Sequence, residues 1–190
     1  MRQYFPLISS DPLTQLIKRK GIYNWNDLVA LIYTIPYGRN AKRTAFELVI
    51  SENQGTCSSK HALLKCIADL NNIPNVTLIL GMYKMNAQNT PHVGTILSVY
   101  QLDYLPEAHC YLKIENVRVD YTHATATMTA IENDIIQEIE IQPVQVGQFK
   151  IAYHRDFLQA WIEENAFAFS LEYLWNIRER CIEALSQKDL

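Results

Sequence analysis

One cysteine of the chain follows a glycine turn and begins an amphipathic segment, where it could act as a nucleophile. Gly55 and Thr56 precede Cys57, and apolar residues then recur at helical spacing up to Asn71. The first-turn N–H groups and the dipole of a helix favour an anion, so they would stabilise a thiolate at this position and lower the thiol pKa. Taken alone, a cysteine in such a place is more often a small capping or buried residue.

Two alternating segments farther along the chain predict a β-hairpin. Apolar and polar residues alternate over 108–114 and again over 117–122, as they do in half-buried strands, and residues 115–116 provide the turn. A register that pairs Leu112 with Val119 keeps the apolar side chains of both strands on one face. A slip of one residue would move one strand's apolar set into water, so the pattern itself favours this register.

The same register places His109 and Asp120 together on the polar face of the hairpin. They are diagonal neighbours, about 7 to 8 Å apart in backbone geometry and within side-chain reach of each other. An imidazole takes and returns protons near neutral pH, and a carboxylate fixes its tautomer. Viewed without the cysteine, an ordinary solvent-facing hairpin surface explains the pattern equally well.

Taken together, these residues resemble the transglutaminase-like superfamily, a circularly permuted relative of the papain-like cysteine proteases. The resemblance rests on Gly-x-Cys at a helix start, a strand histidine, and Val-Asp-x-Thr, and it spans roughly 36–122. It implies that Cys57 is the nucleophile, that His109 is the general base and acid, and that Asp120 orients the imidazole.

The oxyanion of such a reaction would be met by the Cys57 backbone N–H and by one side-chain donor. Gln54 and Asn53, just upstream, are the candidates for that donor. Many members of the superfamily carry an aromatic residue, usually Trp, two positions after the histidine, where this chain has Tyr111. Signatures of protein-crosslinking transglutaminases or arylamine N-acetyltransferases are missing around Cys57, so the subfamily and the substrate stay open.

The other histidines are weaker candidates for catalysis. His61 lies one helical turn after Cys57, where its side chain is poorly aimed at an attacking sulfur, so we expect a surface or supporting residue. His92 falls in a polar loop over 86–94 and could border a cleft, although an ordinary loop histidine is the commoner case. His123 and His154, the latter expected at the start of a helix, receive no role.

Composition excludes several classes of protein. The chain has 190 residues, 48% of them hydrophobic and 19% charged, which predicts a sizeable core and excludes wholesale disorder. Its net charge of −3 and the lack of any basic run longer than residues 18–20 make a nucleic-acid partner unexpected. Cysteines and histidines lack paired ligand spacing, and no glycine-rich phosphate loop occurs, so we expect neither a metal nor a cofactor.

Cysteine usage and the amino-terminal residues indicate a cytoplasmic protein. The four cysteines form no paired or dense pattern, which is typical of free thiols in a reducing compartment, and three of them, on apolar stripes, are expected to be buried: Cys66, Cys110 and Cys181. The amino terminus has no apolar core of a signal peptide, and no apolar run approaches the ~20 residues that a membrane span needs.

Periodicity, capping and turn residues predict the elements that position these side chains. Helices are expected over 13–20, from 24–26 to 34, over 58–71, and as two segments within 155–187 divided near 165–170. By period alone, residues 42–52 fit a helix or a strand, and a helix is favoured. Strands are expected over 76–85, 95–101, 108–114, 117–122 and 145–153. Helices, a block of strands and helices again are typical of an α+β fold.

We therefore expect a single domain over 1–190, with a papain-like or transglutaminase-like core at about 36–122. In it the nucleophile helix packs on an antiparallel sheet, and helical additions occupy 1–35 and 154–190. The expected function is thiol-dependent acyl chemistry on a peptide or other amide substrate, by hydrolysis or by transfer to an amine. Hydrolysis is preferred because nothing in the sequence would exclude water from a thioester. The alternative is a non-catalytic peptide- or protein-binding domain on the same fold.

Overall fold

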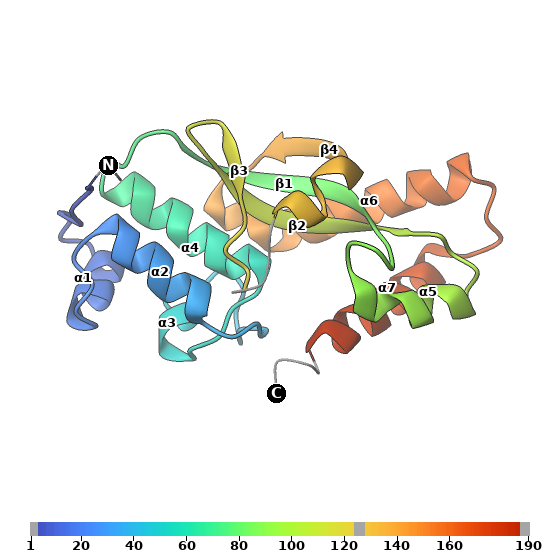
Figure 1. Ribbon diagram of the computed structural model, residues 1–190, viewed down its shortest axis with the longest axis horizontal. Coiled ribbons are helices and arrows are strands. Elements are labelled where there is room, and N and C mark those ends of the chain that lie inside the picture. Colours follow the sequence, from blue (N-terminus) through green and yellow to red (C-terminus); the bar gives the residue numbers. More distant parts are fainter. Residues whose placement is uncertain (1–3, 124–127, 187–190) are drawn as a thin grey trace.

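The computed structural model describes residues 4–123 and 128–186 of the protein. Within these ranges it combines seven α-helices with a four-stranded antiparallel sheet, which confirms the α+β class. The first three helices gather at one end of the sheet, and the fifth and seventh lie at the other end (Figure 1). The residues of the predicted catalytic set come from the middle, between these two groups.

Two capped helices begin the fold. Helix α1 (Pro12–Arg19) starts at Asp11, whose carboxylate accepts from two first-turn N–H groups, and α2 (Trp25–Thr34) is capped by Asn24, whose amide oxygen accepts from the Asp27 N–H. Both helices were predicted. The helix predicted over 42–52 is reduced to the single turn α3 (Leu48–Ser51), and the residues before it form turns.

Helix α4 (Cys57–Leu70) is the central helix, and it begins within one residue of the predicted start. Thr56 caps it: its hydroxyl accepts from the Ser59 N–H, and the Ser59 hydroxyl accepts in turn from the Thr56 N–H. The first eight residues of α4 are all buried, including polar ones. Cys57 is thus the first residue of a helix whose amino-terminal half lies inside the molecule.

The sheet has the order β3-β2-β1-β4 and is built around two long strands. Strand β1 (Val76–Met85) pairs along its whole length with β2 (Leu105–Ile114), and β4 (Ile135–Glu140), a strand that the sequence did not predict, pairs with β1. Gly81 leaves room for a ring from the neighbouring strand, because a Cβ there would lie 2.8 Å from the Tyr111 ring. The Tyr111 hydroxyl donates to Glu138 on β4.

The predicted hairpin register is confirmed. Strand β3 (Val117–Val119) pairs with β2 so that Leu112 faces Val119, and the two turn residues 115–116 adopt left-handed backbone angles, with φ of 51° and 64°. The strand is three residues shorter than the predicted 117–122. Val117 is exposed because β3 is the edge strand of the sheet.

Two predicted strands are wrong. Residues 95–101 fall mostly in helix α5 (Gly94–Val99), where Leu97 is buried and Val99 is exposed, because a short apolar run does not distinguish a strand from one face of a helix. Residues 145–153 form the end of a short 3₁₀ turn and the beginning of helix α6 (Gln148–Glu164). The 3₁₀ turns of the described chain are Pro91–Val93, Met128–Ala130, Glu132–Asp134 and Pro143–Val146.

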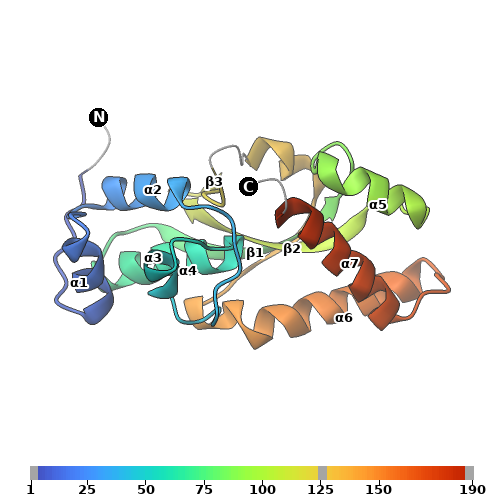
Figure 2. The same ribbon diagram turned by 90° about the horizontal axis from the view of Figure 1, so that it is seen from below.

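Helix α6 and helix α7 (Leu171–Ser186) are divided at 165–170, as predicted. Both faces of the sheet are covered by apolar side chains, since alternate residues of β1 and β2 belong to two separate buried clusters. One cluster joins the sheet to α1, α2 and α4, and the other joins it to α5, α6 and α7. Figure 2 shows α7 crossing beside α6, with its carboxyl end directed towards the start of α4.

None of the helices in the described ranges combines the length and the apolar character that crossing a lipid bilayer requires.

Candidate active site

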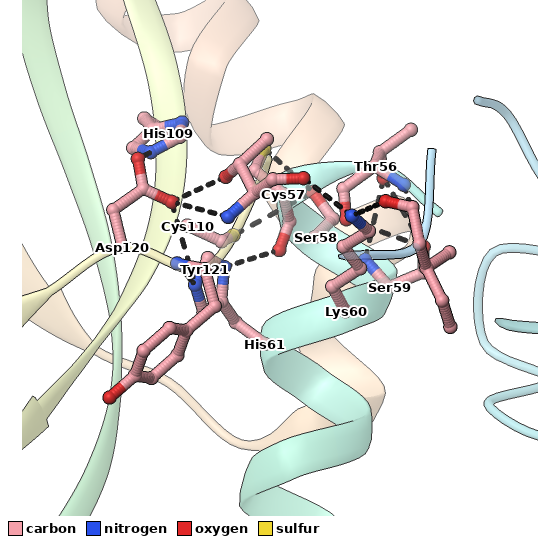
Figure 3. A network of polar contacts seen from close by, with 12 residues as sticks. Thr56, Cys57, Ser58, Ser59, Lys60, His61, His109, Cys110, Asp120 and Tyr121 are labelled. Atoms are coloured by element: carbon pink, nitrogen blue, oxygen red, sulfur yellow. Dashed lines mark hydrogen bonds and ion pairs between the residues drawn. The ribbon is translucent and has the colours of Figure 1, made fainter. Parts of the chain in front are cut away.

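The structure brings the three residues of the predicted catalytic set together from three elements (Figure 3). Cys57 begins α4, His109 lies in β2, and Asp120 directly follows β3. The His109 Nε2 atom lies 2.8 Å from Asp120 Oδ2, and the His109 imidazole lies near enough to the Cys57 thiol for each group to shift the pKa of the other. Because Asp120 occupies Nε2, Nδ1 is the nitrogen left for the sulfur.

Two positive groups favour the thiolate form of Cys57. Burial of the thiol by itself would raise its pKa, but the charges of Lys150 and His109 outweigh burial and hold the Cys57 pKa well below its usual value. The side chain is 8% exposed, so little water screens these charges.

The pKa values of His109 and Asp120 are also shifted, each in the direction that favours the charged form. Burial would lower the His109 pKa, but the negative charges of Asp120 and Cys57 outweigh it and raise that pKa well above the usual value. Asp120 is buried too, yet its attraction to His109 and its hydrogen bonds lower its pKa. Together these shifts favour a thiolate, an imidazolium and a carboxylate in the site.

Both oxygens of Asp120 are held in place. Oδ2 accepts from His109, and Oδ1 accepts from the Thr122 N–H at 2.9 Å and from the Thr122 hydroxyl. This bracing gives a physical reason for the Val-Asp-x-Thr pattern, because the threonine fixes the carboxylate that orients the imidazole.

His61 supports the site and is neither exposed nor next to solvent. Its Nδ1 donates to the Cys57 carbonyl at 2.8 Å, and its Nε2 accepts from the Tyr121 N–H at 2.8 Å. Burial, opposed by Asp120, lowers the His61 pKa, which agrees with a neutral ring that has one donor and one acceptor. His61 thereby ties the first turn of α4 to the segment that carries Asp120 (Figure 3).

Lys60 also links the start of α4 to the segment that carries Asp120. It is fully buried, and its Nζ donates to the backbone carbonyls of Ile35 and Thr122. A Cβ at Gly55 would lie 2.8 Å from Lys60 Cγ and 3.2 Å from Ser59 Oγ. The glycine of Gly-x-Cys therefore leaves space for the side chains of the first helical turn.

Lys150, on α6, is a site residue that the sequence analysis missed. Its Nζ lies 3.8 Å from Cys57 Sγ and donates to Ser58 Oγ at 2.8 Å, and the residue is 6% exposed. The buried positions before and after it are spaced by four: Val146, Lys150, His154 and Leu158. Lysine and histidine are usually counted as exposed residues, so the sequence pattern does not show that these four positions form one buried helical face. For this reason the pattern over 145–153 predicted a strand.

Replacing Lys150 by methionine is expected to raise the Cys57 pKa, because the thiolate loses the cation next to it while the buried volume stays similar. The measurement is the rate of Cys57 alkylation as a function of pH, followed by peptide mass spectrometry. The midpoint should move to higher pH in Lys150→Met and stay in place in Lys84→Met, an exposed lysine of β1. An unchanged midpoint in Lys150→Met would show that Lys150 does not act on the thiol.

A second polar network fixes α7 next to the site. Arg178 donates to both carboxylate oxygens of Glu107, its Nε at 2.9 Å, and this pairing outweighs burial and lowers the Glu107 pKa to about 2. His154 lies inside α6, not at the start of a helix as expected, and its Nε2 hydrogen-bonds the Pro106 carbonyl at 2.9 Å. Burial lowers the His154 pKa, so this ring is neutral beside the ion pair.

The two candidates for the oxyanion donor, Gln54 and Asn53, do not line the cavities at Cys57. The Gln54 amide donates to the Arg39 carbonyl at 2.9 Å, and Asn53 is exposed in a turn with φ of 49°. Of the other cysteines, Cys110 and Cys181 are buried as expected, whereas Cys66 is partly exposed.

Two cavities meet at Cys57. The first, about 290 Å³, extends past Lys150 and Arg178 towards Arg43, and we call it the basic cavity. The second, about 280 Å³, extends past His109, and we call it the histidine cavity; His92 and His123 also line it. Cys57 therefore lies where the linings of two cavities overlap.

Among the described residues, no group of three or more histidine, cysteine, aspartate or glutamate side chains is arranged to hold a metal ion. Comparison with known proteins gives no match to any family model, curated protein or solved structure.

Proposed function

We propose that this protein is a thiol-dependent enzyme that acts on an amide bond, with a papain-like or transglutaminase-like core and Cys57 as the nucleophile. The observation that carries the proposal is that the hydrogen-bonded pair of Asp120 and His109 lines the same cavity as Cys57, and that Cys57 begins a helix where two cavities meet. An isolated buried cysteine would need none of these partners.

The proposed reaction begins with attack of the Cys57 thiolate on the acyl carbon. The bond from sulfur to carbon forms while the carbonyl electrons move to oxygen, and His109 then gives its proton to the leaving nitrogen as the amide bond breaks. The Cys57 N–H has no acceptor within its helix and can donate to the oxyanion, and the charge of Lys150 favours the same negative oxygen.

Hydrolysis of the thioester completes the proposed cycle. His109, now neutral, takes a proton from water, the hydroxide oxygen bonds to the acyl carbon, and the Cys57 thiolate leaves. We propose water as the acceptor because charged and polar side chains form part of the lining of both cavities at Cys57, and such side chains do not exclude water.

The proposal predicts a covalent acyl-enzyme on Cys57. Incubation with a series of fluorogenic peptide amides, followed by rapid acid quenching and mass spectrometry, should give an adduct on Cys57 and a free carboxylic acid as the main product, even with an added amine. Cys57→Ser should abolish both, and Cys66→Ser, a partly exposed thiol on the same helix, should keep the rate. A binding domain would keep its ligand affinity in the Cys57→Ser variant and would form no adduct with any substrate.

A further inference from the structure

The basic cavity concentrates positive charge in an otherwise acidic protein. It continues into a groove of about 440 Å³ between the segment after α2 and the start of α6, and the two share four lining residues: Arg39, Arg43, Thr56 and Ile151. The described lining of this continuous surface holds six of the chain's 17 lysines and arginines but only two of its 20 acidic residues. The six cations are Arg39, Lys42, Arg43, Lys150, Arg155 and Arg178.

Both carboxylates of this surface already form ion pairs with arginines. Glu107 is paired with Arg178, and Glu179 is shared by Arg178 and Arg39. In the part of the chain that the structure describes, no carboxylate lies within ion-pair distance of Lys42, Arg43 or Lys150. A cleft lined by one sign of charge attracts a ligand of the opposite sign, most strongly where its walls exclude water.

The position of His109 decides which part of the substrate the basic cavity takes. In the proposed reaction His109 gives its proton to the leaving nitrogen, so the leaving group must lie on its side of the sulfur. Among the described residues, His109 lines the histidine cavity and not the basic cavity. The acyl part of the substrate is then left for the basic cavity and its groove.

We infer, on the basis of the proposed function, that the substrate is an acidic peptide whose carboxylate side chains lie on the acyl side of the cleaved amide bond. Arg43 is the residue best placed to select it, because it lines both the cavity at Cys57 and the groove and has no carboxylate partner among the described residues. Its guanidinium can hold a carboxylate by two parallel hydrogen bonds.

The test compares two fluorogenic substrates that differ in charge alone: acetyl-Glu-Glu-Ala and acetyl-Gln-Gln-Ala, each joined to the same coumarin amine. The value of kcat/KM should be at least about tenfold higher for the Glu peptide, and the ratio should fall with added salt. Arg43→Gln should bring the ratio close to one, and Lys42→Gln should lower it less. Arg19→Gln removes the same charge from an exposed site on α1 and should leave it unchanged.

Binding is measured separately by fluorescence anisotropy of the labelled peptides with the Cys57→Ser protein. If acyl-enzyme forms equally from both substrates and both peptides bind equally, the inference is wrong while the proposed function stands. If no acyl-enzyme forms but the Glu peptide binds about tenfold more tightly in an Arg43-dependent way, the acidic-peptide site stands and the enzyme proposal fails.

Discussion

Replacing His109 by alanine is expected to slow acylation of Cys57 by about a hundredfold to ten-thousandfold, the usual contribution of a positioned general acid and base. The thiolate loses the neighbouring imidazolium whose charge stabilises it, and the leaving nitrogen loses its proton donor. The measurement is the rate of coumarin release in a single turnover, with enzyme in excess over substrate. Asp120→Asn should also impair this step, because the amide cannot replace the charge that holds His109 as a cation.

His92→Ala is the control for loss of an imidazole. His92 is exposed at the rim of the histidine cavity and makes no part of the Cys57, His109 and Asp120 contacts, so most of the rate should remain. Circular dichroism should show that each variant stays folded. A folded His109→Ala protein that acylates Cys57 at the wild-type rate would exclude His109 from the mechanism.

The residues that a local pattern specifies were predicted well. The Thr56 cap and the apolar period after it define the start of α4, so the place of Cys57 follows from the sequence. Alternation in the two hairpin segments determines their register, and with it the meeting of His109 and Asp120. Both depend on residues close together in the chain.

The residues that tertiary contacts decide were missed. Lys150 reaches Cys57 from 93 positions away, on a helical face whose buried lysine and histidine hide its apolar period. Apolar and polar residues alternate only weakly in strand β4. Its pairing partner β1 lies far away in the sequence, so no local pattern reveals the pairing. For His61, a surface position or a supporting role was expected; the structure shows the second, with both ring nitrogens hydrogen-bonded inside the molecule.

Selective labelling of Cys57 in mild acid is the second large effect we expect. At about pH 6 an ordinary thiol, with a pKa near 8.5, is ionised in roughly one molecule in three hundred, whereas Cys57 stays a thiolate above its own lowered pKa. Cys66 is the natural reference within the same protein, because burial raises its pKa although its side chain is partly exposed. Brief iodoacetamide treatment near pH 6 should therefore alkylate Cys57 about ten to a hundred times faster than Cys66.

The sign of the pH dependence follows from the two shifted groups. The Cys57 pKa is lowered and the His109 pKa is raised, so the thiolate–imidazolium pair exists between them. Labelling of Cys57 should fall only when the pH drops through the lowered thiol pKa. Similar labelling of Cys57 and Cys66, with the pH profile of an ordinary thiol for both, would speak against a nucleophile.

The most direct measurement is the ultraviolet absorbance of the thiolate, recorded as a pH titration of the wild-type protein minus that of Cys57→Ser. It needs no substrate and reports the ionisation of this one sulfur. We predict a difference absorbance whose midpoint lies well below the pH at which an ordinary thiol ionises. A thiolate that appears only above about pH 8 would contradict the ion pair with His109, and with it the central claim that Cys57 is an activated nucleophile.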